Sequence, residues 1–439
     1  MNTNIILDHE PVADGGWLVR ALLKIEGETR TTDGDRAPLN LSLVLDRSGS
    51  MGGGKLAAVK KAAALLVQRL DPSDTLSVIA YDDEVTVIAS PSTGADQPNL
   101  VSAIHSIHTG GTTNLSGGWL QGRQFVSDHA REGSVNRILL LTDGHANVGI
   151  TAPDKLIGLC RNAATEGITT TTIGFGADYD EDLLTAMADA GGGGAYYIEE
   201  PDQAPAVFEE ELAGLLSIAA QNVRVAITVA DAAESCRVLH SYPSSSEGEL
   251  LTLELGDLYA REPRPVLAEF LMKPAEDGSE LEEMDVGTMV VTGDVLTADG
   301  GVEQQTITIP IRLSPVEGGI AVPEVRRELI LLEAVEEREK ALKARAAGEF
   351  AEARRGLAKL SERMAAFDPD DAVLREEASD LRRMVASLHD DVVNESDKKY
   401  MRYRARYSSR GRHEAVQSIS RDVWDEKRNA LDSDDDDAV

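Results

Sequence analysis

The strongest constraint on the fold is a regular alternation of short apolar runs with longer amphipathic segments between about residues 41 and 220. Runs such as LSLVLD (41–46) and RILLLTD (137–143) are typical of parallel strands that are covered on both faces. Segments such as LAAVKKAAALLVQRL (56–70) and PDKLIGLCRNAATEG (153–167) have the apolar period of helices. Strands that alternate with helices predict an α/β fold with a doubly wound, mostly parallel, Rossmann-like sheet.

After residue 220 the pattern changes to strands with no helices between them. The segments are VRVAITV, SCRVLHSY, LLTLELGDL, PVLAEFLMK, MVVTGDVLTA and QTITIPIRL. They predict an antiparallel β-sandwich of about six strands. We expect the N-terminal strand at 17–27 to join this sandwich, so that the parallel-sheet domain is an insertion within it.

From Val322 the period changes again, and three amphipathic segments predict a helical domain. The last nine residues, LDSDDDDAV, carry five Asp and are expected to be disordered. The predicted domains are therefore an α/β domain at 38–218, a sandwich at 1–37 plus 219–320, a helical domain at 321–425 and an acidic tail at 426–439.

Composition excludes several classes of function. Lys plus Arg number 43 and Asp plus Glu number 76, so the net charge is −33. Such a charge argues against a general nucleic-acid binder and against docking on anionic membranes. No apolar run approaches the ~18 residues of a membrane span, and the N-terminus lacks the pattern of a signal peptide. We expect a protein of the cytoplasm of a bacterial-type cell, with no membrane and no nucleic acid among its partners.

Polar side chains follow two strands that should be neighbours in the sheet. The first strand of the α/β domain ends in Asp46, which opens a D-x-S-x-S motif with Ser48 and Ser50. The fourth strand ends in Asp143, and a Thr-containing segment, GGTTNLSGGW, lies between the two. In the strand order 3-2-1-4-5-6, the first and fourth strands meet where the winding reverses, and ligands bind beyond the carboxyl ends there. Two carboxylates and three hydroxyls form an oxygen-only set that suits Mg²⁺, with Mn²⁺ or Ca²⁺ able to replace it.

Three motifs, D-R-S-G-S-M, G-G-T-T-N and L-L-T-D-G, occur in this order and resemble the metal-ion-dependent adhesion site of von Willebrand factor A domains. The resemblance covers about residues 38–218. It implies that Ser48, Ser50 and Thr113 contact the metal. It also implies that Asp46 and Asp143 hold the metal directly or through water.

The resemblance selects Thr113 rather than Thr112, because the threonine of the family lies just before the turn that starts the helix. In that family an acidic residue of a protein partner often completes the coordination. Bacterial proteins with such domains often work with ATPases of the AAA+ class, which makes such an ATPase a candidate partner. The implied function is a non-enzymatic, metal-dependent protein-interaction module that binds a partner's Asp or Glu.

A nucleotide hydrolase is the alternative. The segment Gly49–Lys55 satisfies G-x-x-x-x-G-K after a strand, and Asp143 would then bind magnesium at the end of another strand. A phosphate-binding loop of this kind continues with Ser or Thr, whereas Leu56 follows here. Nothing in the sequence resembles a nucleophile–base pair, so we do not expect an enzyme.

The segment KKYMRYRARYSSRGR (398–412) has seven basic residues, no acidic residue and three tyrosines at helical spacing. Two interpretations are open for this segment. It is a platform for single-stranded nucleic acid, or it is a helix that docks on the protein's own acidic surfaces. The net charge of −33 favours the second interpretation.

Overall fold

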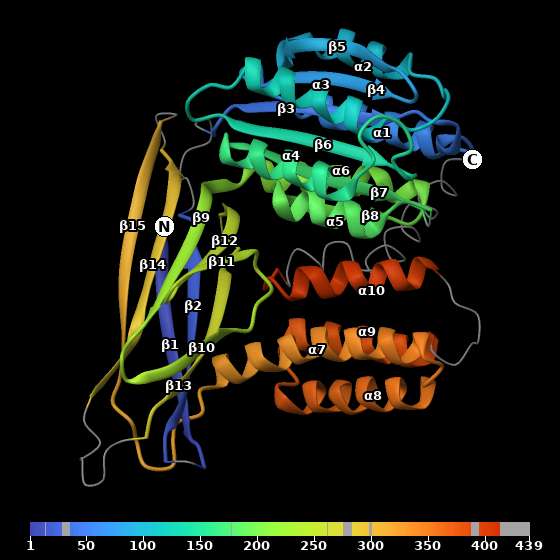
Figure 1. The fold of residues 1–439 in the computed structure, drawn as a ribbon. Helices are drawn as coiled ribbons and strands as arrows, with labels where there is room; N and C mark the ends of the chain where they lie inside the picture. Colours follow the sequence, from blue (N-terminus) through green and yellow to red (C-terminus); the bar gives the residue numbers. More distant parts are fainter. Residues whose placement is uncertain are drawn as a thin grey trace. The chain divides into compact units, whose positions relative to one another are not determined.

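The structure is a computed structural model and describes residues 1–13, 15–28, 36–176, 178–260, 262–274, 283–297, 301–387 and 395–412. It divides into two compact units (Figure 1). The α/β unit comprises Thr29–Asn222 and Asp294–Gln304. The sheet–helix unit comprises Met1–Glu28, Val223–Gly293 and Gln305–Val439.

The α/β unit is built on one six-stranded sheet with the order β5-β4-β3-β6-β7-β8. The strands are β3 (Leu39–Asp46), β4 (Thr75–Tyr81), β5 (Val85–Thr93), β6 (Val135–Thr142), β7 (Ile168–Phe175) and β8 (Gly192–Ile198). Only β5 runs antiparallel to its neighbour. If the strands of this unit are numbered from β3 as the first, their order across the sheet is 3-2-1-4-5-6. The predicted fold class is therefore confirmed. Every residue of β3, β4, β6 and β7 is buried, as expected for strands covered on both faces.

Six α-helices cover this sheet (Figure 1). They are α1 (Lys55–Gln68), α2 (Gln97–His105), α3 (Leu115–Asp128), α4 (Pro153–Thr165), α5 (Glu181–Ala190) and α6 (Ala204–Leu216). Short 3₁₀ turns lie at Gly49–Met51, Gly94–Asp96 and Pro201–Gln203. The apolar pattern after residue 200 continues past the end of α6, because the strand β9 begins at Ile218.

The sheet–helix unit contains two further antiparallel sheets, with the orders β1-β2-β13-β10 and β11-β12-β9-β14-β15. Their strands are β1 (Asn2–Pro11), β2 (Trp17–Glu26), β9 (Ile218–Val229), β10 (Ala233–Val238), β11 (Ser244–Glu247), β12 (Leu250–Tyr259), β13 (Arg264–Met272), β14 (Met284–Leu296) and β15 (Val302–Leu313). The strand β2 precedes the α/β unit in the chain and pairs with β13, which follows it. The α/β unit is therefore inserted between strands of these sheets, as predicted.

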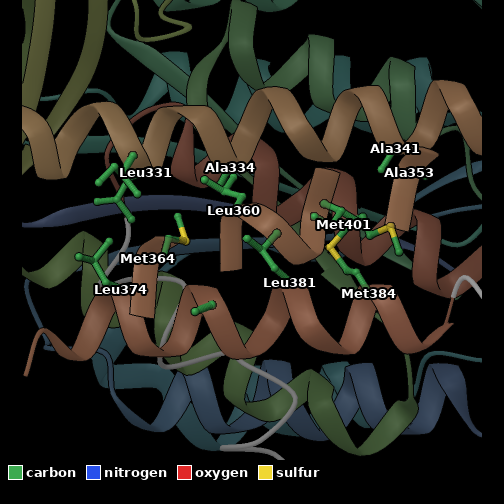
Figure 2. Packing of buried hydrophobic residues seen from close by; sticks show 13 residues of the cluster. Leu331, Ala334, Ala341, Ala353, Leu360, Met364, Leu374, Leu381, Met384 and Met401 are labelled. Atoms are coloured by element: carbon green, nitrogen blue, oxygen red, sulfur yellow. The ribbon is translucent and has the colours of Figure 1, made fainter. Parts of the chain in front are cut away.

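Among the described residues, four helices complete the sheet–helix unit: α7 (Pro323–Ala346), α8 (Phe350–Phe367), α9 (Ala372–Ser387) and α10 (Glu395–Ser408). Figure 2 shows their shared core of Leu, Met and Ala side chains, to which α10 contributes Met401. The start of α7 packs on β2 and β13 through Val325, Leu22 and Leu267. This contact covers Leu22 and Leu267, and most residues of both strands are buried. Sheets and helices form one compact unit here, and the domain boundaries drawn from the sequence stay predictions.

In the segment 398–412, every residue from 399 onward is buried or half-buried within the sheet–helix unit. Tyr403 and Tyr407 are largely shielded from solvent. The Arg412 guanidinium donates to Glu262 Oε1 at 2.6 Å and lies over the Tyr407 ring. Side chains in such positions are not available to stack on nucleotide bases, so the structure supports the docked-helix interpretation. The predicted acidic tail at 426–439 lies outside the described residues. Within the residues that are described, no helix is long and apolar enough to cross a membrane.

Candidate metal site

The five predicted site residues come from three loops at the carboxyl ends of β3 and β6 and at the start of α3. Asp46 is the last residue of β3, and Asp143 directly follows β6. These two strands are hydrogen-bonded neighbours in parallel register, so both loops open at the same edge of the sheet. Both carboxylates are completely buried. The structure therefore brings Asp46 and Asp143 to one place, as the sheet order predicts.

Asp46 is held by hydrogen bonds on both oxygens. Its Oδ1 accepts from the backbone N–H of Ser48 at 2.7 Å, and its Oδ2 accepts from the Thr142 hydroxyl at 2.6 Å. Burial raises the pKa of Asp46 above its ordinary value despite these hydrogen bonds, and the nearby charge of Asp143 adds to the effect. A cation beside the carboxylate of Asp46 would stabilise its charged form.

The two serines extend this site toward solvent. The Oγ atoms of Ser48 and Ser50 are 3.1 Å apart, and the Ser50 hydroxyl donates to Asp143 Oδ1 at 2.6 Å. Ser48 is buried, whereas Ser50 is exposed on the 3₁₀ turn. A continuous row of oxygen atoms thus runs from the loop after β3 to the loop after β6, and it reaches solvent at Ser50.

Thr113 faces the same space from the start of α3. The Thr113 N–H donates to Asn147 Oδ1 at 2.9 Å, and its carbonyl accepts from the N–H of Asn147. A Cβ atom placed on Gly144 would lie 3.7 Å from Thr113 Oγ1 and 3.8 Å from Ser50 Oγ. The two hydroxyls therefore line a space beside Gly144 that the missing side chain leaves open.

The structure adds a positioning residue that the sequence reasoning missed. Asp82, just after β4, accepts the Gly111 N–H at 3.1 Å and the Arg47 guanidinium at 3.1 Å. Its carbonyl accepts the Asn114 N–H at 2.7 Å. Asp82 thus ties the loop after β3 to the loop that carries Thr113. In the sequence, Asp82 lies in a two-residue DD turn between two apolar segments, and no local pattern marks it as part of a site.

Hydrogen bonds determine the protonation state of the Asp82 carboxylate. Burial by itself raises the pKa of Asp82, but the N–H groups of Glu84 and Gly111 and the Arg47 guanidinium outweigh burial. The net result is a pKa below the ordinary value for an aspartate. Asp82 is therefore a stable anion at neutral pH.

Lys55 is the second residue with a role that the sequence reasoning did not assign. Its ammonium donates to Asp143 Oδ2 at 2.6 Å, while the other oxygen of Asp143 accepts from Ser50. Lys55 is the first residue of α1. In the sequence, Lys55 stands out only as the lysine of the G-x-x-x-x-G-K pattern.

The donor chemistry fits a hard divalent cation. The converging groups are two carboxylates and three hydroxyls, with no imidazole or thiol. Across the described ranges, no group of three or more His, Cys, Asp or Glu side chains is arranged to hold a metal ion. A metal at this edge therefore depends on hydroxyl oxygens and water in addition to the carboxylates, as Mg²⁺ accepts.

The fold and the site define a class: doubly wound α/β domains with carboxylate and hydroxyl groups at the carboxyl edge of the sheet, where the strand order reverses. Comparison with known proteins agrees, because residues 40–210 match the family model of the von Willebrand factor type A domain. This part of the chain is therefore similar to that family, as the three sequence motifs predicted. Domains of this family are in general protein-interaction modules and not catalysts.

Relatives and solved structures extend the similarity. The chain is 30% identical over 277 residues to the protein sll0103 of Synechocystis sp., covering 61% of this chain and 65% of that one. It is 29% identical over 211 residues to YfbK of Escherichia coli, covering 47% and 37%. The chain thus spans less than two thirds of the length of these relatives. A von Willebrand factor type A structure from Catenulispora acidiphila aligns with a TM-score of 0.68 at 18% identity, covering 93% of this chain and 96% of that one, which shows a shared fold.

Proposed function

We propose that the α/β unit binds a divalent cation, Mg²⁺ in the first place, and through it the carboxylate of a protein partner. Asp46, Ser48, Ser50, Thr113 and Asp143 would hold the ion. The single observation that carries the proposal is the continuous contact from Ser48 through Ser50 to Asp143 at the carboxyl edge of the sheet.

The charges of the site support a partner that is acidic. Two carboxylates balance a divalent ion without excess, and hydroxyl oxygens donate only weakly. A metal held in this way keeps affinity for one more anionic ligand in place of water. A partner's Asp or Glu would gain a charge-assisted contact in a crevice that is partly removed from solvent. An isolated small acid would bind more weakly because it brings no surrounding interface.

The hydrolase alternative has less support. In the segment Gly49–Lys55, Ser50 bonds to Asp143 and Lys55 pairs with the same carboxylate. The family match and the structural similarity give no support to a phosphate-binding loop. We therefore infer a binding module without catalysis, and an AAA+ ATPase remains a candidate partner.

Calorimetric titration with Mg²⁺ tests the metal site. The variant Asp46→Asn removes one charge but keeps the shape, and the Thr142 hydroxyl can turn to accept from the new amide. We expect the wild-type protein to bind one Mg²⁺ and Asp46→Asn to bind at least tenfold more weakly. Asp154→Ala, on the exposed surface of α4, is the control and should bind as wild type. Equal Mg²⁺ affinity in wild type and Asp46→Asn would exclude this site.

Metal dependence of partner binding is the second test. Capture on the immobilised protein, with Mg²⁺ or with EDTA, should retain a partner only with Mg²⁺. Thr113→Ala should weaken the same capture, because it removes a hydroxyl from the metal's surroundings. A partner that stays bound in EDTA and to Thr113→Ala would place the interface elsewhere.

A further inference from the structure

We propose that Lys55 is a built-in counter-ion of the metal-free site, which a divalent cation must displace from Asp143. The inference rests on the proposed metal site and goes beyond it. It assigns to Lys55 a role in setting metal affinity: its ammonium occupies Asp143 in the absence of metal and yields this oxygen when metal binds.

The position of Lys55 is unfavourable for the helix that carries it. Lys55 is the first residue of α1, where the partial positive charge of the helix N-terminus disfavours a cation. The preceding residue, Gly54, has a φ of 104° and provides no side-chain cap. A lysine at this position does not stabilise the helix. Its ion pair with Asp143 offsets the unfavourable interaction of the ammonium with the helix N-terminus.

The ion pair with Lys55 stabilises the Asp143 carboxylate, which would otherwise be buried without a nearby positive charge. Asp143 is completely buried, and its Oδ2 accepts the Lys55 ammonium at 2.6 Å. Asp46, which is also completely buried, bonds to hydroxyl and amide donors that carry no full charge. With Lys55 in place the cluster of these three groups has a net charge of −1. Without Lys55 it would have −2 in a region of low polarity, which is costly.

Lys55 can also leave. Its side chain is 25% exposed, so part of it already contacts solvent. A Cβ atom on Gly176 would lie 3.6 Å from the ammonium, so the glycine leaves space on that side. Lysine is a compact charge on a flexible four-carbon stem and can reach water while the stem stays packed. A divalent ion, which brings twice the charge, can then take the freed oxygen.

The competition lowers metal affinity, because part of the binding free energy is used to break the ion pair. It also changes the charge of the loaded site. Asp46 and Asp143 neutralise the metal, and the released ammonium remains nearby as an additional positive charge. The metal-loaded face would then attract an acidic partner more strongly than the metal-free face does.

The test is a Mg²⁺ titration of wild type, Lys55→Met and Lys55→Arg by calorimetry, with thermal melting in EDTA and in saturating Mg²⁺. Lys55→Met should bind Mg²⁺ about threefold more tightly or better, whereas Lys55→Arg keeps the charge and should stay close to wild type. In EDTA, Lys55→Met should melt below wild type, and saturating Mg²⁺ should reduce this difference. Lys60→Met is the matched control, because Lys60 also belongs to α1 but donates to backbone carbonyls of His105 and Ile107. It should leave Mg²⁺ affinity unchanged.

Each outcome separates this inference from the proposed function. If wild type binds Mg²⁺ and Lys55→Met binds equally or more weakly, Lys55 is no competitor and the inference is wrong while the metal site stands. If Lys55→Met binds but wild type does not, Mg²⁺ cannot displace the ammonium, so the proposed function of the wild-type protein fails and the displacement is wrong. If neither protein binds, both proposals fail. Should Lys55→Met not fold in EDTA, Lys55→Gln prepared in Mg²⁺ gives the same comparison of affinities.

Discussion

Asp82 illustrates how a single carboxylate can fix a binding loop without being a ligand itself. It accepts hydrogen bonds from Gly111 and Arg47, and its backbone carbonyl accepts from Asn114. A Cβ on Gly110 would collide with the Asp82 carboxylate, so the glycine is needed for this close approach. The position of Thr113 therefore depends on a residue about thirty positions earlier in the chain.

Asp82→Asn should lower the free energy of unfolding by about 1–3 kcal/mol at pH 7, because one carboxylate oxygen becomes an amide that cannot accept. The folded-state pKa of Asp82 lies below its ordinary value, so the charged form contributes stability above that value. This contribution is lost as the pH falls through the folded-state pKa. Urea unfolding should therefore show a constant difference from wild type between pH 7 and about 4, and a smaller one below.

Asp83→Asn is the control, because Asp83 is the exposed neighbour of Asp82. It should unfold within about 0.5 kcal/mol of wild type. A stability difference for Asp82→Asn that is absent at pH 7, or that increases with acid, would contradict this account of the tie.

At the residue level, the sequence predicted the groups that stand at strand ends. The sequence was sufficient to predict four of the site residues, because each lies at or just after the end of an apolar run. They are Asp46, Ser48, Ser50 and Asp143. The roles of Thr142, Asp82 and Lys55 depend on Asp46, Gly111 and Asp143, which lie 96, 29 and 88 positions away in the chain. Such pairings exist only after the sheet has formed, so no local pattern predicts them.

Helix α3 shows at the level of elements why glycines occur inside a helix. Its glycines reduce helix propensity, but they allow the helix axis to approach the sheet closely. A Cβ on Gly118 would lie 2.6 Å from the Tyr81 ring, and a Cβ on Gly122 would lie 2.7 Å from Val44. The close approach places the start of α3, and with it Thr113, at the edge of the sheet.

Gly118→Ala should therefore destabilise the protein by about 1–3 kcal/mol through overpacking, although alanine favours helices. Gly158→Ala in α4 is the matched control, because no atom lies within 4 Å of its Cβ position. It should stabilise the protein by up to about 1 kcal/mol. Urea unfolding of the two variants would give opposite signs. The same sign for both would mean that close packing of α3 is not the reason for its glycines.

The elements with strong apolar patterns were predicted well, and those with weak patterns were not. The strands of the six-stranded sheet and its hairpin followed from buried runs and turns. Strand β1 was not expected, because its exposure pattern is irregular and it depends on pairing with β2. Strand β11 is the exposed segment SSSE, which carries no apolar signal at all. Strand β8 begins at Gly192, within a glycine run that resembles a turn in the sequence.

At the scale of the whole molecule, the last described helix secures the sheet–helix unit through buried charges. Arg404 of α10 donates to Glu377 Oε2 at 2.8 Å and lies 3.6 Å from Asp380, both on α9. Arg338 of α7 binds the same two acids. Burial lowers the pKa of Arg404, but the surrounding carboxylates outweigh burial and keep it above its ordinary value. Three helices therefore share one buried ionic cluster.

Arg404→Met should lower the free energy of unfolding by about 3–5 kcal/mol, because the buried carboxylates of Glu377 and Asp380 lose a cation that pairs with both. Thermal melting with circular dichroism measures this loss. Arg382→Met, on the exposed side of α9, removes the same charge from the surface and should shift the melting temperature little. Equal melting of Arg404→Met and wild type would show that α10 contributes little to this unit.

The central claim is that one divalent cation binds at the junction of β3, β6 and the start of α3. A crystal soaked in Mn²⁺ and measured for anomalous scattering tests it most directly. The account predicts one strong peak within about 2.0–2.3 Å of Ser48 Oγ and Ser50 Oγ, with the Lys55 ammonium moved away from Asp143. A crystal with full Mn²⁺ exposure that shows no peak there, with Lys55 still bonded to Asp143, would contradict it.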